Sequence, residues 1–203
     1  MGGAQPLNDE PASGRKPDSL VRLKLAARRL FVERGYHDTR PQDIAREAGL
    51  GHGTFYLHYP DKRACFQAFV DEAREELGVY LRLRRVPGAS LEERIGATIA
   101  AIYDYSESHP GVLRAAMADE SMIGTEGTQA PPLLMRWGRE WAEMLRKAAD
   151  AGVTCDSYDA AIIGQAIVGA IHQVSRAGAR GKIGREALVE NLTRFLTRAL
   201  KPD

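Results

Sequence analysis

The chain has 203 residues, of which 44% are hydrophobic and 27% charged, and its formal net charge is +1. This composition is typical of a globular protein with a buried core. It contains no run of 18 apolar residues and begins without the basic and apolar segments of a signal peptide, so we expect a cytoplasmic protein with no membrane partner. Cys65 and Cys155 stand far apart, which predicts two reduced thiols, no metal site and no cofactor.

The N-terminal residues predict a tail followed by a helix. Residues 1–17 are rich in Gly, Pro and polar residues without periodicity, so we expect them to be disordered. Asp18 or Ser19 is suited to cap the first helix. Apolar residues then recur at helical spacing as far as Phe31, and Gly35 is suited to end the helix in a left-handed conformation.

The next segment predicts a helix-turn-helix. A short helix is expected from Pro41 to Ala48, and Thr39 and Gln42 have the spacing of a capping box. Gly49 provides the turn, and a second short helix is expected from about His52 to Tyr59. The apolar residues that are spaced to bury one shared face are Ile44, Ala45, Ala48, Leu50 and Phe55. Polar and aromatic side chains of the second helix then face outward, as in helices that enter the major groove of DNA.

Basic residues are concentrated in the same part of the chain. Between Arg15 and Arg63 there are eleven basic and six acidic residues, a net charge of +5, whereas residues 64–203 carry −2. A basic segment beside a slightly acidic body favours contact with phosphates. A solvated charged surface is the alternative for several of these residues.

Beyond residue 60 the pattern is helical throughout. The expected helices cover residues 60–85, 90–108, 111–123, 133–151, 157–177 and 185–200. No β-hairpin signal is present. We therefore predict an all-α fold of about nine helices.

The last two predicted helices offer an interface for a second copy of the chain. Residues 157–177 are apolar nearly all round, so one side must face something besides its own core. Gly164, Gly169 and Ala170 would permit close helix approach. In the final helix one apolar stripe contains Leu188, Leu192, Phe195, Leu196 and Ala199. Because one short recognition helix buries little DNA surface, we expect a homodimer that reads a palindrome; burial of both helices within one subunit is the alternative.

The segment from Phe31 to Lys62 resembles the N-terminal domain of the TetR family of bacterial transcriptional regulators. It has a Phe-x-x-x-Gly-Tyr corner, then a Thr, an Ile-Ala pair and an Ala-Gly turn, and it closes with GTFYLHYPDK at residues 53–62. The match covers about residues 19–69, and the rest of the chain resembles the family only in helix count and length. The resemblance implies a helix-turn-helix DNA-binding domain at residues 18–63 and a ligand-binding and dimerisation domain at residues 64–203.

Residue chemistry and the resemblance together suggest the DNA contacts. The glycine at position 53 lets the helix start approach phosphates closely, and the hydroxyl of Thr54 suits a phosphate or base edge. In the family, the tyrosine that matches Tyr56 contacts the DNA backbone. For His58 a role in supporting the helix corner is the alternative, and for Arg40 a solvated arginine. The predicted DNA-binding residues are Thr39, Arg40, His52, Gly53, Thr54, Tyr56, His58 and Lys62.

The recognition helix departs from the family pattern. Gly51 stands where Ser is frequent, His52 where Lys or Arg is frequent, and Leu57 where a polar residue is frequent. Because no Arg or Lys precedes Lys62 in this helix, bidentate reading of guanine is not available from it. We expect discrimination to rest on His52, Thr54, a Leu57 contact with a thymine methyl group, and DNA shape.

The resemblance also implies an effector cavity among the middle helices, and a fourth helix that moves when the effector binds. Aromatic, methionine and histidine residues are the candidates, and ordinary core packing is the alternative for each of them. The candidate ligand contacts are Tyr103, Met117, Met122, Trp137, Trp141 and His172. Their chemistry suits an apolar or amphipathic effector.

These observations predict a ligand-responsive dimeric repressor that binds a double-stranded palindromic operator and releases it when an effector binds. An all-α enzyme is one alternative, but the sequence offers no catalytic residues: it has no nucleophile–base pair, metal-ligand spacing or phosphate loop. The other alternative is a helical interaction module or an activator that keeps the N-terminal domain without effector-controlled repression.

Overall fold

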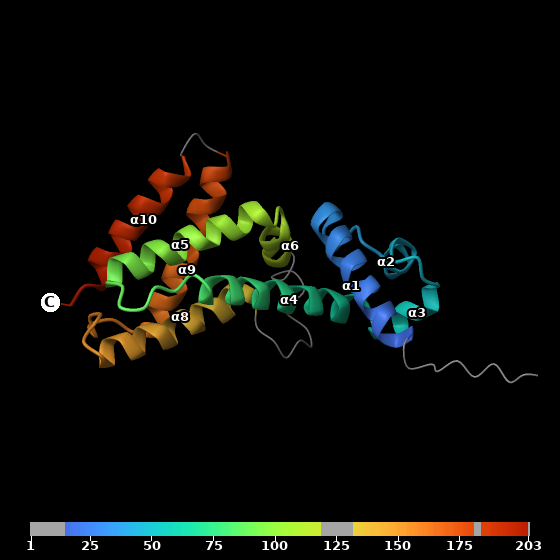
Figure 1. Cartoon of the computed structure of the whole chain (residues 1–203), viewed down its shortest axis with the longest axis horizontal. Coiled ribbons are helices and arrows are strands. Elements are labelled where there is room, and N and C mark those ends of the chain that lie inside the picture. The colour runs from blue at the N-terminus through green and yellow to red at the C-terminus, as the bar shows by residue number, and fades with distance from the viewer. Residues whose placement is uncertain (1–14, 119–131, 181–183, 203) are drawn as a thin grey trace, which may run out of the picture. The chain divides into compact units, whose positions relative to one another are not determined.

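The computed structural model describes residues 15–118, 132–180 and 184–202, and the regular elements in these ranges are all helices (Figure 1). The helices are α1 (Arg15–Arg34), α2 (Pro41–Glu47), α3 (His52–Tyr56), α4 (Lys62–Arg82), α5 (Leu91–Ser108), α6 (Val112–Ala118), α8 (Leu133–Asp150), α9 (Ala160–Arg180) and α10 (Arg185–Leu200). The prediction of an all-α fold with about nine helices is confirmed. Within the described ranges no helix is long and apolar enough to span a membrane.

The chain divides into two compact units, Met1–Phe69 and Val70–Asp203, which we call the head and the body. The described head contains α1, α2, α3 and the beginning of α4. The body contains the rest of α4 and the helices α5 to α10.

The head is built around the apolar stripe of α1. Phe31 is fully buried, and its ring meets Phe66 edge to face at a centroid distance of 5.0 Å and Phe69 at 5.7 Å. Ile44 of α2 and Phe55 of α3 are also fully buried. Both short helices therefore contribute buried side chains to the shared core, as the helical spacing predicts.

The start of α1 differs from the prediction. The helix begins at Arg15, so Asp18 and Ser19 lie inside it rather than capping it. Pro17 falls in the first turn, where a backbone N–H has no helical partner in any case, so proline does not interrupt the helix. The predicted tail therefore ends earlier than residue 17, and residues 1–14 lie outside the described part of the chain.

The predicted capping box at Thr39 is not formed. The N-cap of α2 is Arg40, without a side-chain capping bond, and the Thr39 hydroxyl donates instead to the carbonyl oxygens of Leu30 at 3.3 Å and Gly35 at 2.7 Å. A complete capping box does occur at α5. There the Ser90 hydroxyl accepts from the backbone N–H of Glu93, whose carboxylate accepts from the backbone N–H of Ser90.

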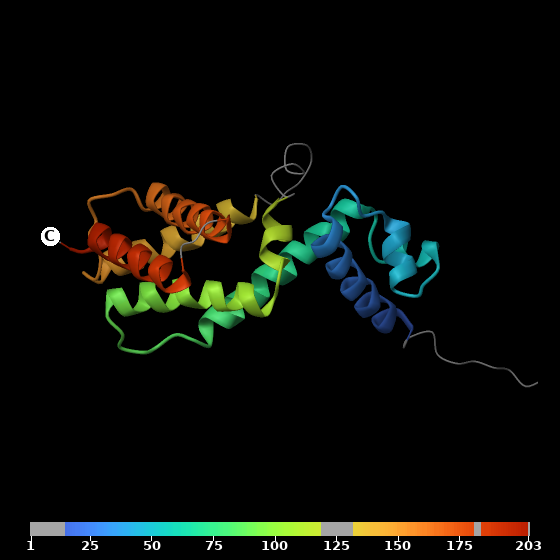
Figure 2. The same ribbon diagram turned by 90° about the horizontal axis from the view of Figure 1, so that it is seen from above.

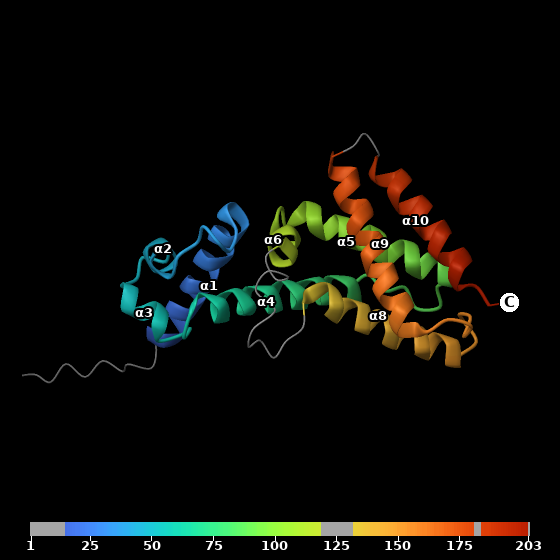
Figure 3. The ribbon, with the colours of Figure 1, turned by 180° about the vertical axis from the view of Figure 1, so that it is seen from behind.

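The body packs as pairs of long helices, with α8 against α9 and α5 against α10 (Figures 2 and 3). Its larger apolar cluster contains Ile95, Ile99, Leu145, Ile167, Ile171, Leu192, Leu196 and Leu200. A smaller cluster is formed by Leu77, Tyr105 and Leu113. The backbones of α8 and α9 approach closely at Gly164. A Cβ atom at this position would lie 2.2 Å from the carbonyl oxygen of Gly138, so a side chain would not fit there.

Candidate nucleic-acid interface

The recognition helix α3 has only five residues, and it is anchored by one of them. Phe55 is fully buried, and its ring lies 5.6 Å from that of Tyr59, which is also buried. The N-cap residue Gly51 supplies no side-chain capping bond. The orientation of α3 therefore depends on the buried aromatic residues and on the chain that enters and leaves the helix.

The outer side of α3 carries the side chains that the sequence predicts to meet DNA. Tyr56 is 49% exposed and Leu57 71% exposed, and the His52 ring lies edge to face with Tyr56 at 5.2 Å. Thr54 is half-buried beside them. A Cβ atom at Gly53 would meet no heavy atom within 4 Å, so this glycine lies on an open surface. The structure thus brings together His52, Gly53, Thr54 and Tyr56, with Leu57 next to them.

His58 points into the head rather than along this outer side. A hydrogen bond of 2.7 Å joins its Nε2 to the hydroxyl of Ser19 on α1, and both residues are at least half-buried. The imidazole therefore ties the corner between α3 and α4 to the first helix. This geometry favours the supporting role that the sequence left open for His58; a DNA contact by His58 stays a prediction.

Lys62 also makes its contacts within the head. Its ammonium donates to the carbonyl oxygen of Tyr36 at 2.9 Å and lies 4.2 Å from the centre of the Tyr36 ring. A longer bond of 3.4 Å reaches the carbonyl oxygen of His37. These contacts tie the start of α4 to the loop between α1 and α2. Burial, followed by the charge of Asp61, raises the pKa of Tyr36.

The two remaining predicted DNA contacts lie in different environments. Arg40 is exposed at the N-terminus of α2, where its side chain can reach a phosphate. Thr39 is fully buried, and its hydroxyl is bonded within the head. The side chain of Thr39 is therefore placed to hold the loop before α2 rather than to touch DNA.

Sequence reasoning missed the contact made by Arg22. This α1 residue donates from Nη2 to the carbonyl oxygens of Ala48 and of Gly49, the latter at 3.1 Å. Both carbonyls belong to the turn of the helix-turn-helix. The only sequence signal was a basic residue beside the buried Leu23, and that does not identify a partner 26 residues away.

The body divides the predicted ligand residues between its two apolar clusters. Tyr103 and Trp141 pack against the larger cluster, and Met117 and Trp137 against the smaller one. His172 is half-buried on α9, where burial and then the charge of Arg176 lower its pKa. Met122 lies outside the described residues.

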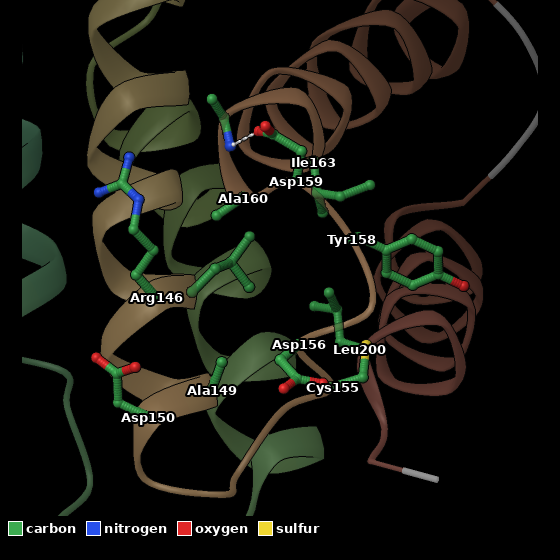
Figure 4. Close-up of a pocket in the computed structure, with 12 residues that line it drawn as sticks. Arg146, Ala149, Asp150, Cys155, Asp156, Tyr158, Asp159, Ala160, Ile163 and Leu200 are labelled. Carbon is green, nitrogen blue, oxygen red and sulfur yellow. Dashed lines mark hydrogen bonds between the residues drawn. The ribbon is translucent and has the colours of Figure 1, made fainter.

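A hollow of about 360 Å³ lies at the end of the body where α8, α9 and α10 meet (Figure 4). Arg146, Asp150, Cys155 and Asp159 are among its lining residues, and Asp159 accepts hydrogen bonds from the first backbone N–H groups of α9. The predicted ligand residues are not in its lining. This hollow therefore gives no support to the predicted effector contacts.

The last two helices expose apolar side chains. Ile162 on α9 is 67% exposed and Phe195 on α10 is 62% exposed. A Cβ atom at Gly169 would meet nothing within 4 Å, so this glycine also lies on an open surface. Gly164 instead faces α8 of its own chain, which shows that its small size serves packing within the subunit.

Among the described residues, no cluster of His, Cys, Asp or Glu is arranged to hold a metal ion. Three features distinguish the head. They are the exposed ridge of α3, formed by His52, Tyr56 and the adjoining Leu57, the buried Phe55, and the hydrogen bond between His58 and Ser19 of α1. They describe a small helical scaffold that presents side chains for contact with another molecule.

Comparison with known proteins agrees with this geometry. The family described as "Bacterial regulatory proteins, tetR family" matches residues 25–69. The HTH-type transcriptional regulator EthR of Mycolicibacterium smegmatis is 24% identical over 153 residues, which cover 70% of this chain and 66% of EthR. The chain thus spans just under two thirds of the length of EthR.

Solved structures share the fold of the described chain. The fatty acid degradation regulator FadR from Bacillus halodurans superposes with a TM-score of 0.70 at 18% identity, covering 89% of this chain and 94% of FadR. FadR from Bacillus subtilis, solved in complex with stearoyl-CoA, gives a TM-score of 0.67 at 18% identity over 87% and 97% of the two chains. The family match thus assigns residues 25–69 of the head to the tetR family of bacterial regulatory proteins, and the solved structures show that the described chain shares the fold of such regulators.

Proposed function

We propose that this protein is a dimeric transcriptional repressor that binds a palindromic operator through α3 and leaves it when a small-molecule effector binds to the body. The observation that carries the proposal is the division of α3 into a buried anchor, Phe55, and an exposed ridge that includes Tyr56 and Leu57. The match of the head to the tetR family and the basic character of the head support it.

The proposed reading surface consists of the α3 ridge and the start of α2. His52 and Thr54 offer hydrogen-bonding groups for base edges, and the exposed Leu57 offers an apolar contact for a thymine methyl group. Tyr56 and Arg40 are the proposed phosphate contacts. Lys62 remains a proposed phosphate contact because it sits at the start of α4, where its bonds to Tyr36 hold it in place.

Gly53 provides a sharp test of the proposed docking. In the free protein there is space for a Cβ atom at this position, and alanine favours helix more than glycine does. We therefore expect Gly53→Ala to leave thermal stability unchanged or slightly raised while DNA affinity falls, because the added methyl group meets the DNA backbone. The probe is the strongest duplex recovered when the wild-type protein selects from random sequences.

Selection of a duplex from random sequences tests the repressor hypothesis against the alternative of a helical interaction module that does not bind an operator. Binding of the selected duplex should weaken steeply with salt, since phosphate contacts release counterions. Tyr56→Phe should weaken binding by removing one phosphate contact without changing the core. Recovery of no specific duplex by the wild-type protein would support the interaction module instead. A reporter gene under the selected site then separates repression from activation.

The exposed apolar surface of α9 and α10 supports a homodimer through the last two helices. Ile162 and Phe195 are each more than 60% exposed, which is unfavourable for large apolar side chains in water. We expect Phe195→Asp to convert a dimer into a monomer in light scattering, with helix content unchanged. Arg194→Asp, one position earlier on the exposed side of α10, is the matched control.

The effector proposal concerns an apolar or amphipathic small molecule. The Bacillus subtilis FadR neighbour was solved with stearoyl-CoA, and the aromatic and methionine residues of the smaller body cluster suit an apolar chain. A thermal-shift screen of acyl-CoA thioesters, free fatty acids and uncharged apolar compounds tests this, since a ligand of the folded state raises stability. A true effector must also release the selected duplex.

A further inference from the structure

The turn of the helix-turn-helix closes the end of α2 with two backbone hydrogen bonds. The N–H of Leu50 donates to the carbonyl oxygen of Ala45 at 2.9 Å, and the N–H of Gly49 donates to that of Arg46 at 3.0 Å. Gly49 has φ +65°, the left-handed conformation that this closure requires. The carbonyl oxygens of Ala48 and Gly49 take no part in this closure.

Arg22 of α1 satisfies both of these carbonyls. Its Nη2 donates to the Ala48 and Gly49 oxygens, and its Nη1 lies 3.7 Å from the carboxylate of Asp18, one helical turn earlier. A guanidinium at this position also meets the partial negative charge at the C-terminus of α2. One side chain thus bonds the first helix to the turn that precedes the recognition helix.

This contact matters for α3 because the turn that Arg22 holds leads directly into the start of that helix. The helix begins three residues after Gly49, and its N-cap has no side-chain bond. Phe55 and the Ser19–His58 hydrogen bond fix its later part, whereas His52 and the residue after it follow directly from the turn.

We propose that Arg22 is a positioning residue for the DNA-reading surface: by holding the turn carbonyls it fixes where His52, Gly53 and Thr54 are presented. The inference rests on the proposed DNA-binding function. Arg22 acts through the turn and is not itself a contact to the operator.

Arg29 provides a matched control on the same helix. It also joins α1 to α2, but it pairs with the Glu47 side chain at 2.9 Å rather than with the turn carbonyls. Both arginines are on the surface of α1, with Arg22 42% and Arg29 65% exposed. Arg22→Ala and Arg29→Ala therefore each remove a contact that α1 makes with α2 or its end. Only Arg22→Ala removes the hydrogen bonds to the turn carbonyls.

The first measurement uses the free full-length protein, so it does not depend on DNA binding. Amide hydrogen exchange should be faster in Arg22→Ala than in the wild type at Thr54, whose N–H donates to the carbonyl oxygen of Gly51, and unchanged at Leu57, which follows the part of α3 that Phe55 holds. It should be unchanged at both positions in Arg29→Ala. Equal exchange in the two variants overturns the inference, whatever the protein does with DNA.

The second measurement uses the selected duplex and an unrelated duplex. We expect Arg22→Ala to lower affinity for the selected duplex about tenfold, as expected for a lost charged hydrogen bond, with the salt slope and the affinity for unrelated DNA unchanged. A salt slope reduced by about one, with both affinities lowered, would identify Arg22 as a direct phosphate contact and overturn the inference. Failure of the wild-type protein to select any duplex would instead count against the proposed function.

A double-mutant cycle adds a test at the turn. A Cβ atom at Gly49 would lie 2.7 Å from Arg22 Nη2, so any side chain there displaces the guanidinium. Asn tolerates the left-handed conformation better than other residues, which makes Gly49→Asn the least strained variant. If Arg22 acts through the turn, Arg22→Ala should cause little further loss of selected-duplex affinity in the Gly49→Asn background. Full additivity of the two losses would contradict the proposal.

Discussion

The head and the body are held together in different ways. In the head, polar side chains reach across the chain to backbone carbonyls: Arg22 to the turn, Thr39 to the end of α1, and Lys62 to the α1–α2 loop. In the body, long helices pack through apolar clusters and close backbone contact at Gly164, and ion pairs such as Arg136–Asp71, at 2.6 Å, join α8 to α4.

The head and the body also differ in their likeness to known proteins. Thr39 and Lys62, whose hydrogen bonds each need a particular residue type, lie within residues 25–69, which match the family, whereas Arg22 lies just before them. An apolar cluster needs only suitable volume, and different sequences can supply it. The FadR fold accordingly covers 89% of this chain at only 18% identity.

The largest expected effect tests the close packing of the body. In Gly164→Ala the new methyl group would collide with backbone atoms of α8, which cannot rotate away, so we expect a loss of about 3 kcal/mol in the free energy of unfolding. Chemical denaturation of the full chain measures it. Gly138→Ala should behave differently, because its Cβ would meet the end of the Gln165 side chain, which can move. Equal, small losses in both variants would contradict close backbone packing of α8 against α9 at Gly164.

An intermediate effect compares the same substitution in the two regions. Thr39→Val in the head removes a hydroxyl bonded to two carbonyls and should cost about 1 kcal/mol in the free energy of unfolding. Thr193→Val in the body removes a buried hydroxyl that has no hydrogen-bond partner among the described residues, so it should be neutral or stabilising. Similar losses at both positions in thermal unfolding would remove the distinction between polar ties and apolar packing.

The smallest effect concerns the two thiols. Burial in the head raises the pKa of Cys65 to about 12, whereas Cys155 in the body is partly exposed. At pH 8 we expect a thiol reagent to modify Cys155 in the folded protein and to spare Cys65 until the head unfolds. The stability that neutral Cys65 contributes is complete below its unfolded pKa near 9.0 and is lost as pH rises toward 12. Rapid modification of Cys65 in the native protein would indicate an open head.

Helical periodicity predicted most of the fold, but it did not identify partners across the chain. The bounds of α10 were predicted as observed, because its apolar stripe and flanking residues are local signals. The role of Thr39 was predicted wrongly as a cap, because the same hydroxyl serves equally well as a donor to carbonyls that only the folded head brings near. The supporting bonds of His58 and Lys62 depend on Ser19 and Tyr36 in the same way.

The ligand candidates show a second limit of sequence pattern. Aromatic and methionine residues at helical spacing identify a core, and the structure divides four of the candidates between the two apolar clusters of the body. Gly164 shows a third limit, since its small size was expected to admit a partner chain. Which side of α9 faces α8 is a matter of tertiary packing, and the sequence of one helix does not determine it.

The division of α3 into one buried residue and an exposed ridge has a consequence for how such a protein can change over time. Tyr56 and Leu57 carry little of the folding energy, because they are about half or more exposed and lie outside the buried core. On the proposed reading surface, substitution of Leu57 would alter the preferred DNA sequence and substitution of Tyr56 the affinity, both without loss of the buried core, whereas substitution of the buried Phe55 or of the left-handed Gly49 would disturb the fold itself. Under the proposed function, the choice of DNA target and the stability of the fold are separable traits, so a duplicated copy of the gene could acquire a new operator through a few surface changes.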